Sequence, residues 1–150
     1  MRTEELFNED WLFCRFGAMP NGEYLAEPTS LECLTLDASL WQEVTLPHDW
    51  AIAGPFRQEL DGSTGKLPWA GIGWYRKQFV LDIEDKNKRI FIDIDGAMSN
   101  STVWINEKKV GGWPYGYNSY RVEITSVAEF GKINIIAIRL DNPPASSRWY

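Results

Sequence analysis

Residues 89–112, "RIFIDIDGAMSNSTVWINEKKVGG", contain the pattern that decides the fold. In the first part, isoleucines alternate with Phe91, Asp93 and Asp95, so one side of the stretch is apolar and the other is mostly polar. A period of two is typical of a β-strand with one buried face. The segment "STVWINEKKVGG" then predicts two short strands around "NEKK", with Asn106 suited to the turn.

The same period continues on both sides of this stretch. "WYRKQFVL" (74–81) and "KINIIAIRLDN" (132–142) have apolar faces formed by Tyr75, Phe79 and Leu81 and by Ile136, Ile138 and Leu140. "EDWLFCRF" (9–16) and "YRVEIT" (120–125) extend the series, while "LDASLWQEV" and "TSVAEFG" are each suited to about one helical turn. Strands that recur about every ten residues between turn signals predict an antiparallel sandwich or barrel.

Two loops stand out between the predicted strands. Residues 46–73 are rich in glycine and proline, and residues 111–120, "GGWPYGYNSY", combine glycine with aromatic side chains. Loops of this length in a small domain are usually functional or lie against a neighbouring surface. The aromatic side chains of Trp113, Tyr115 and Tyr117 fit either a sugar contact or a contact with another domain, whereas Trp74 lies in a predicted strand and is expected to pack.

The composition excludes several classes of function. The chain has 15 basic and 21 acidic residues, and "KNKR" is its longest basic cluster, so a nucleic-acid surface is not expected. Cys14 and Cys33 are too few for a disulfide framework and lack metal-ligand spacing, so we expect two buried free thiols. The acidic N-terminus has no apolar run like that of a signal peptide, and no stretch is long enough to span a membrane. We therefore expect a cytoplasmic protein.

The side chains that most resemble catalytic groups do not form a complete site. His48 precedes Asp49 in "LPHDW", but neighbouring residues of an extended segment point in opposite directions, and no "GxSxG" nucleophile motif is present. We expect His48 to hydrogen-bond to backbone in a corner. Asp93 and Asp95 could act as an acid–base pair on a glycoside, yet their alternation with isoleucine favours a solvated outer face. Neither a metal site nor a cofactor site is indicated.

Six sequence blocks occur in the order found in one known family: "VTLPHDW", "GIGWYRKQF", "IDIDGAMSNSTVWINEKKVG", "YGYNSYRVEIT", "NIIAIRLDN" and "SSRWY". Over essentially residues 7–150 the chain resembles the N-terminal domain of glycoside hydrolase family 2, with the β-galactosidases as the most similar subgroup. The resemblance implies an all-β fold, an antiparallel β-sandwich of the jelly-roll type that is similar to galactose-binding domains, formed as a single domain by residues 1–150.

The resemblance also implies where catalysis takes place. In this family a second β-sandwich and a TIM barrel follow, and the barrel carries the two catalytic glutamates of a retaining mechanism. Because the family continues past the position of Tyr150, we expect the chain to be a fragment of a longer enzyme. The fragment itself would carry no catalytic residue, and the parent enzyme would hydrolyse terminal β-galactosides.

The residues that could meet the sugar are also implied by the resemblance. The loop after the "IRLDN"-like strand approaches the active site in the family, which points to Asp141, Asn142, Arg148 and Trp149. A carboxylate or an amide can hydrogen-bond to sugar hydroxyls, and an indole can stack on the ring. In the alternative interpretation, Asp141 and Asn142 only cap the strand end as an Asx-turn, and Trp149 packs between domains.

Three functions remain open at this point. The first is an accessory domain that forms one wall of the active site, with the remaining domains of the parent glycosidase and a galactoside substrate as partners. A homo-oligomeric parent is compatible with this interpretation. The second is a stand-alone carbohydrate-binding module, and the third is a structural or interaction domain without a ligand. Galactoside, glucuronide and mannoside enzymes share this architecture, so the sugar also stays open.

Overall fold

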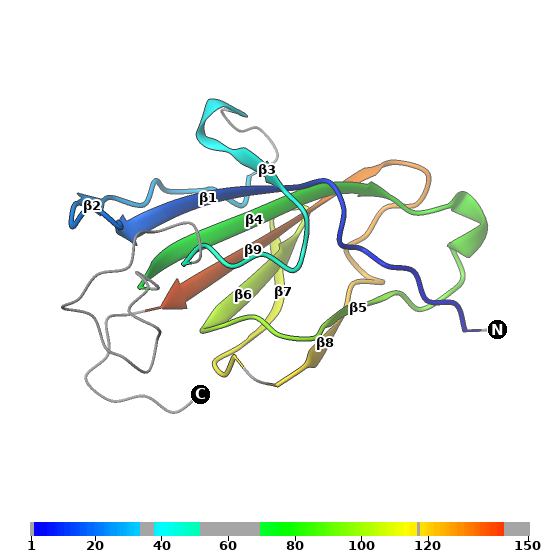
Figure 1. The fold of residues 1–150 in the computed structure, drawn as a ribbon. Coiled ribbons are helices and arrows are strands. Elements are labelled where there is room, and N and C mark those ends of the chain that lie inside the picture. The colour runs from blue at the N-terminus through cyan, green and yellow to red at the C-terminus, as the bar shows by residue number, and fades with distance from the viewer. Residues whose placement is uncertain (1, 34–37, 52–69, 117, 143–150) are drawn as a thin grey trace.

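The computed structural model describes residues 2–33, 38–51, 70–116 and 118–142 of the 150-residue chain. These residues form an all-β structure with two layers (Figure 1). Its strands are β1 (Trp11–Ala18), β2 (Tyr24–Leu25), β3 (Gln42–Val44), β4 (Gly71–Val80), β5 (Phe91–Ile94), β6 (Ser101–Ile105), β7 (Lys108–Trp113), β8 (Tyr120–Glu123) and β9 (Ile133–Asn142). The short 3-10 helices η1 (Ala38–Leu40) and η3 (Ile83–Asp85) complete the described elements.

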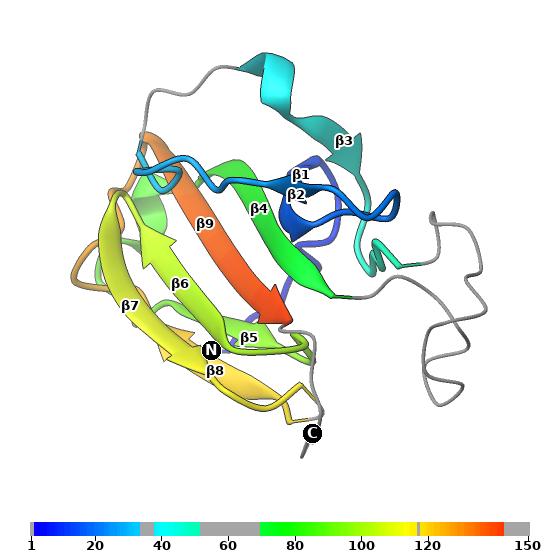
Figure 2. The same ribbon diagram turned by 90° about the vertical axis from the view of Figure 1, so that its left-hand side faces the viewer.

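The larger layer is a seven-stranded sheet in the order β2-β1-β4-β9-β6-β7, with β3 also paired to β1. Strands β5 and β8 form the second layer, which Figure 2 shows on one face of the large sheet. All of these strand pairs are antiparallel, and the pair β4–β9 runs in register over ten residues, from Gly71–Asn142 to Val80–Ile133. The predicted antiparallel jelly-roll sandwich is confirmed.

The main core lies between the two layers. Val103, Ile105 and Ile136 of the large sheet have no exposed surface, and Val122 packs against them from β8. Burying one such aliphatic side chain stabilises the fold by about 1.5–3 kcal/mol. The isoleucines before and within β5 pack on the same core, as the alternation in the sequence predicts.

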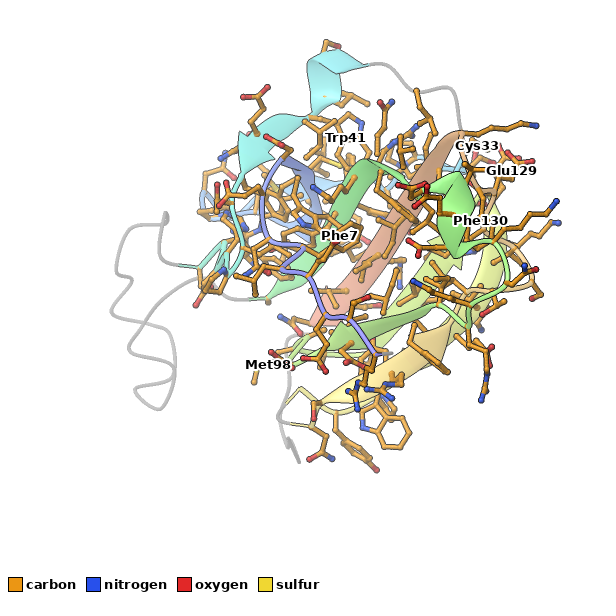
Figure 3. The ribbon with its side chains drawn as sticks, turned by 90° about the vertical axis from the view of Figure 1, so that its right-hand side faces the viewer. Phe7, Cys33, Trp41, Met98, Glu129 and Phe130 are labelled. Carbon is orange, nitrogen blue, oxygen red and sulfur yellow. The ribbon has the colours of Figure 1, made fainter. Side chains whose placement is uncertain are left out.

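The other face of the large sheet is also covered. Cys14, Phe16 and Trp74 point to this side and pack against Leu31, which belongs to the segment between β2 and β3. Trp41 is partly buried against the same cluster, on the side of the sheet away from Phe7 and the main core (Figure 3). Central strands β4 and β9 are therefore buried on both faces, which explains their long runs of buried residues.

Most of the predicted elements agree with the structure, and the differences occur at their ends. Strand β4 begins at Gly71 rather than Trp74, because Gly71, Ile72 and Gly73 pair with the last residues of β9. Leu81 lies just beyond the strand. The predicted turn contains only Asn106 and Glu107, both with positive φ, and the two following lysines already belong to β7.

Two further differences concern the short elements. The stretch after β8 forms a single turn in which Val127 and Ala128 donate to the carbonyl of Ile124. Strands β2 and β3, of two and three residues, are too short for a periodic pattern to indicate. None of the helices in the described part of the chain is long and apolar enough to cross a membrane.

Candidate functional site

One end of the sandwich carries two of the predicted sugar-contact residues, Asp141 and Asn142. Strand β9 ends at Asn142 directly beside Gly71, where β4 begins (Figure 1). The loop between β5 and β6 reaches the same end: Met98 lies there, whereas Glu129 and Phe130 lie near the start of β9 (Figure 3). Asp141 donates its backbone N–H to the carbonyl of Ser99 over 2.9 Å, which ties this loop to the strand.

Asn142 is buried in this corner, with 7% of its surface exposed. Its side chain lies on the face of the sheet that carries Leu140, toward the main core. The carboxamide oxygen Oδ1 accepts a hydrogen bond of 2.9 Å from the hydroxyl of Ser99. A carboxamide also carries two N–H donors, so Asn142 keeps the capacity to bind a further acceptor.

Asp141 lies on the opposite face of the sheet. Its carboxylate is 3.5 Å from a guanidinium nitrogen of Arg139, two residues earlier in the strand. Arg139 also donates to Glu27 over 2.7 Å, and Glu27 accepts a second hydrogen bond of 2.7 Å from the indole N–H of Trp74. Burial alone would lower the pKa of Arg139, but the hydrogen bond and charge of Glu27, with Asp141, outweigh it and raise that pKa.

The alternative interpretation of Asp141 and Asn142 as an Asx-turn stays a prediction, because the backbone that would complete the turn lies outside the described residues. Both residues belong to β9, where Asp141 pairs with Ile72 and Asn142 with Gly71. Among the described residues, their side chains contact Ser99 and Arg139. Arg148, Trp149 and Tyr117 lie outside the described residues, so their predicted roles stay predictions.

Three residues of this site were not anticipated from the sequence: Ser99, Arg139 and Glu27. The period of two places Arg139 on the face of Asp141, so strand alternation alone could have indicated their ion pair. Glu27 and Ser99 reach the site from irregular segments far away in the sequence. No local pattern indicates such contacts.

His48 is a packing residue in a corner, and its partner differs from the predicted one. Its Nδ1 atom is joined by a 2.8 Å hydrogen bond to the hydroxyl of Tyr75 rather than to backbone, because the ring lies against Phe13 and turns into the core. Asp49 accepts instead from the backbone N–H of Ala51 over 2.8 Å. Burial lowers the pKa of His48, and the charge of Asp49 opposes this only in part.

The pair Asp93 and Asp95 does not form an acid–base site. Asp93 lies on the exposed face of β5 and accepts two hydrogen bonds, of 2.6 and 3.1 Å, from the guanidinium of Arg121 on β8. This hydrogen bonding lowers the pKa of Asp93, so it stays a charged surface partner. Asp95 lies beyond the strand and is exposed. The predicted solvated outer face is confirmed.

In the part of the chain that the structure describes, the cysteines form no disulfide and the acidic, His and Cys side chains form no metal-binding group. Cys14 is a buried free thiol, and Cys33 is a free thiol that is only half-buried, in contrast to the expected burial of both. Burial, with the charge of Glu27, raises the pKa of Cys14 to about 12. Among the described residues, no three His, Cys, Asp or Glu side chains gather in a way that could hold a metal ion.

The aromatic residues divide into two groups. Trp74 is buried and stacks on Trp104 at 5.1 Å between ring centroids, which confirms its predicted packing role. Trp113 and Tyr115 are 41% and 46% exposed, and their rings meet edge to face at 6.4 Å. Their loop adjoins the site, because Asn100 donates its backbone N–H to the carbonyl of Pro114.

Comparison with known proteins identifies relatives of one kind. No family model matches the chain. The chain is 40% identical to a β-galactosidase of Bacteroides ovatus and 38% identical to a putative β-glucuronidase of Formosa agariphila, each over 99% of its own length. It spans only 17% and 14% of these two relatives.

Solved structures show the same relationship. A glycosyl hydrolase family 2 member from Bacteroides cellulosilyticus superimposes with a TM-score of 0.82 and 34% identity, over 97% of this chain and 18% of that protein. A β-glycosidase from Bacteroides vulgatus superimposes with a TM-score of 0.78, also at 34% identity, over 96% of this chain and 18% of that protein. The whole chain therefore corresponds to a small part of each of these larger glycosidases.

Proposed function

Since this chain is an N-terminal domain of glycoside hydrolase family 2, we propose that it is an accessory domain of a longer β-galactosidase and forms one wall of its sugar-binding site. The proposal assigns the contact with sugar to the end of the sandwich where β9 finishes. Catalysis would be carried out by groups outside the chain, in line with the family resemblance, in which the catalytic glutamates lie on a barrel domain.

The observation that carries the proposal is the hydrogen bonding of the Asn142 carboxamide. Its carboxamide oxygen is held by Ser99, while its amino group makes no hydrogen bond to any described residue and is not sealed from solvent. A polar group that is partly satisfied and fixed at the end of a strand is suited to bind a ligand hydroxyl. The carboxylate of Asp141, 38% exposed, adds an acceptor on the other face of the same strand.

The charges at this end favour a neutral sugar. A glucuronide carries a carboxylate, which proteins usually bind with an arginine or a lysine. Two guanidinium groups lie near this end: that of Arg139 is paired with Glu27 and Asp141, and that of Arg15 donates to the carbonyl of Ala70 and lies over the Trp50 indole. A neutral β-galactoside needs no such cationic partner. The relatives include both β-galactosidases and β-glucuronidases, so this preference rests on the charges alone.

The exposed aromatic pair Trp113 and Tyr115 supports a role for this end in contacts with other domains or with a sugar. We assign it to packing against the remaining domains of the parent enzyme, because large rings contribute much apolar area to interfaces. The same pair is the observation that favours the second candidate function, a stand-alone carbohydrate-binding module, since an exposed indole can also stack on a sugar ring.

Two experiments test the proposal. In the longer enzyme, replacement of Asn142 tests the sugar contact through kcat/KM. On the 150-residue chain, protein-observed NMR titrations with galactose, lactose and glucuronic acid distinguish the two candidates. Local shifts around Asn142 or Trp113 that saturate at millimolar sugar support a binding module, whereas no shift with a kinetic effect in the enzyme supports the accessory wall.

A further inference from the structure

We propose that Ser99 is a positioning residue for Asn142: its hydroxyl holds the carboxamide oxygen, so that the amino group stays free to donate to a sugar hydroxyl. The inference rests on the proposed function, which brings Asn142 to the substrate. It adds a residue that lies in the loop between β5 and β6, 43 positions away from Asn142 in the sequence.

The hydroxyl of Ser99 has a choice of two acceptors. It lies 2.9 Å from Oδ1 of Asn142 and 3.2 Å from the backbone carbonyl of Asp141. A hydroxyl has one proton to donate, and hydrogen bonds between a hydroxyl and an oxygen are usually about 2.5–3.0 Å long. The shorter distance therefore identifies the side chain of Asn142 as the main acceptor.

The position of Ser99 is fixed by its surroundings. Its carbonyl accepts from the N–H of Asp141 over 2.9 Å, and the side-chain amide of the next residue, Asn100, donates to the carbonyl of Asp141 over 3.1 Å. Asn100 is held in turn by its backbone N–H, which donates to Pro114. These hydrogen bonds tie the loop to the end of β9 and fix the position of the Ser99 hydroxyl.

Asn142 faces no side chain in the neighbouring strand β4. Its cross-strand partner is Gly71, which has no side chain to cover the carboxamide. A Cβ atom at this position would lie 3.0 Å from the carbonyl oxygen of Ala18, and the φ of 139° also disfavours other residues. Close packing against β1 therefore requires glycine at position 71, and Asn142 has no cross-strand side chain beside it.

The orientation of the carboxamide determines what it can bind. Rotation of the group by half a turn exchanges its donor and acceptor ends, so a free carboxamide would present either one. With Oδ1 held by Ser99, the group presents N–H donors, and the matching ligand atom is an acceptor such as a hydroxyl oxygen. Preorganised donors lose less conformational freedom on binding than mobile ones.

The direct test measures the ¹⁵N order parameter of the Asn142 side-chain NH₂ group by NMR relaxation on the 150-residue chain. A high order parameter means a rigid group. The chain supplies its own references: the carboxamide of Asn134 is fully hydrogen-bonded, and Asn118 is exposed. In the wild type we expect the order of Asn142 to match that of Asn134. In Ser99→Ala it falls toward the value of Asn118, and in Ser99→Thr, which keeps the hydroxyl, it stays high.

Equal order in the wild type and Ser99→Ala would overturn the inference. If Ser99→Ala does not fold, two other measurements keep the test open. A wild-type Asn142 side chain as mobile as that of Asn118 would overturn the inference equally well. The order parameter of Asn142 in Ser99→Thr, compared with that in Ser99→Val, then isolates the effect of the hydroxyl. The exposed Ser126→Ala serves as a matched control that leaves the order of Asn142 unchanged.

A kinetic cycle in the longer enzyme separates this inference from the proposed function. If Ser99 acts through Asn142, Ser99→Ala lowers kcat/KM in the wild type but has no further effect once Asn142 is alanine. A further loss in that background contradicts the inference. If Asn142→Ala itself leaves kcat/KM unchanged while the NMR result holds, the sugar contact fails and only the orientation of Asn142 by Ser99 stands.

Discussion

Gly73 lies so close beneath the indole of Trp50 that a Cβ atom on Gly73 would be 2.3 Å from Cζ3 of Trp50. The guanidinium of Arg15 lies over the same indole at 5.8 Å and donates to the carbonyl of Ala70 over 2.7 Å. Trp50 and Ala70 flank residues 52–69. Trp50 and Ala70 therefore lie near the same part of the large sheet, next to the end that carries Asn142.

Gly73→Ala should destabilise the domain by about 1–3 kcal/mol, because the new methyl group overlaps the Trp50 ring and forces it to move. Urea unfolding followed by tryptophan fluorescence measures the change. Gly96→Ala is the matched control, since its Cβ would lie 3.4 Å from its nearest neighbour, the carbonyl oxygen of Gly116. Equal stability of the two variants would show that Trp50 does not depend on Gly73.

Glu27→Ala should cost about 1–3 kcal/mol of unfolding free energy, because it leaves the buried indole N–H of Trp74 without its acceptor and removes an ion-pair partner of Arg139. Glu4→Ala, which breaks the exposed ion pair with Arg2, should change stability by no more than about 0.5 kcal/mol. Chemical denaturation of both variants checks the contrast. A Glu27 variant as stable as the Glu4 variant would contradict the bridging role.

Stability should fall at mildly acidic pH through His48. Burial lowers the pKa of His48 in the folded chain below the ordinary value of 6.5, so the unfolded chain binds more protons in this range. The stabilisation from neutral His48 is present above pH 6.5 and is lost as the pH falls through and below that value. Melting temperatures at pH 7.5 and 5.5 should therefore differ more for the wild type than for His48→Gln; an equal drop in both would refute this.

Cys14 should react with iodoacetamide at least about tenfold more slowly than Cys33, since the thiolate is the reactive form and burial raises the pKa of Cys14 to about 12. Peptide mapping by mass spectrometry after timed alkylation at pH 8 gives both rates. In urea the two rates should become similar, which serves as the control. Similar rates in the folded chain would mean that Cys14 is not protected.

The arrangement of the two layers could be predicted because a strand with one buried face carries apolar residues at every second position of the sequence. The isoleucines before and within β5, and the apolar faces of β4 and β9, all point to the main core as the alternation indicates. Family resemblance added Asp141 and Asn142. Periodicity could not supply the second covered face of the sheet, where Glu27 and Leu31 arrive from an irregular segment, or the contact of Ser99 with Asn142. These contacts join residues that are far apart in the sequence and meet only in the folded chain, so no local pattern indicates them.

The central claim is that the end of β9 contacts the sugar through Asn142. The most direct test is the kcat/KM of Asn142→Ala in the longer enzyme with a β-galactoside, beside Asn118→Ala as an exposed control and after confirmation that both variants keep the wild-type melting temperature within a few degrees. Loss of one hydrogen bond that is stronger in the transition state predicts a decrease of about tenfold or more. A kcat/KM equal to that of the wild type and of Asn118→Ala would contradict the claim.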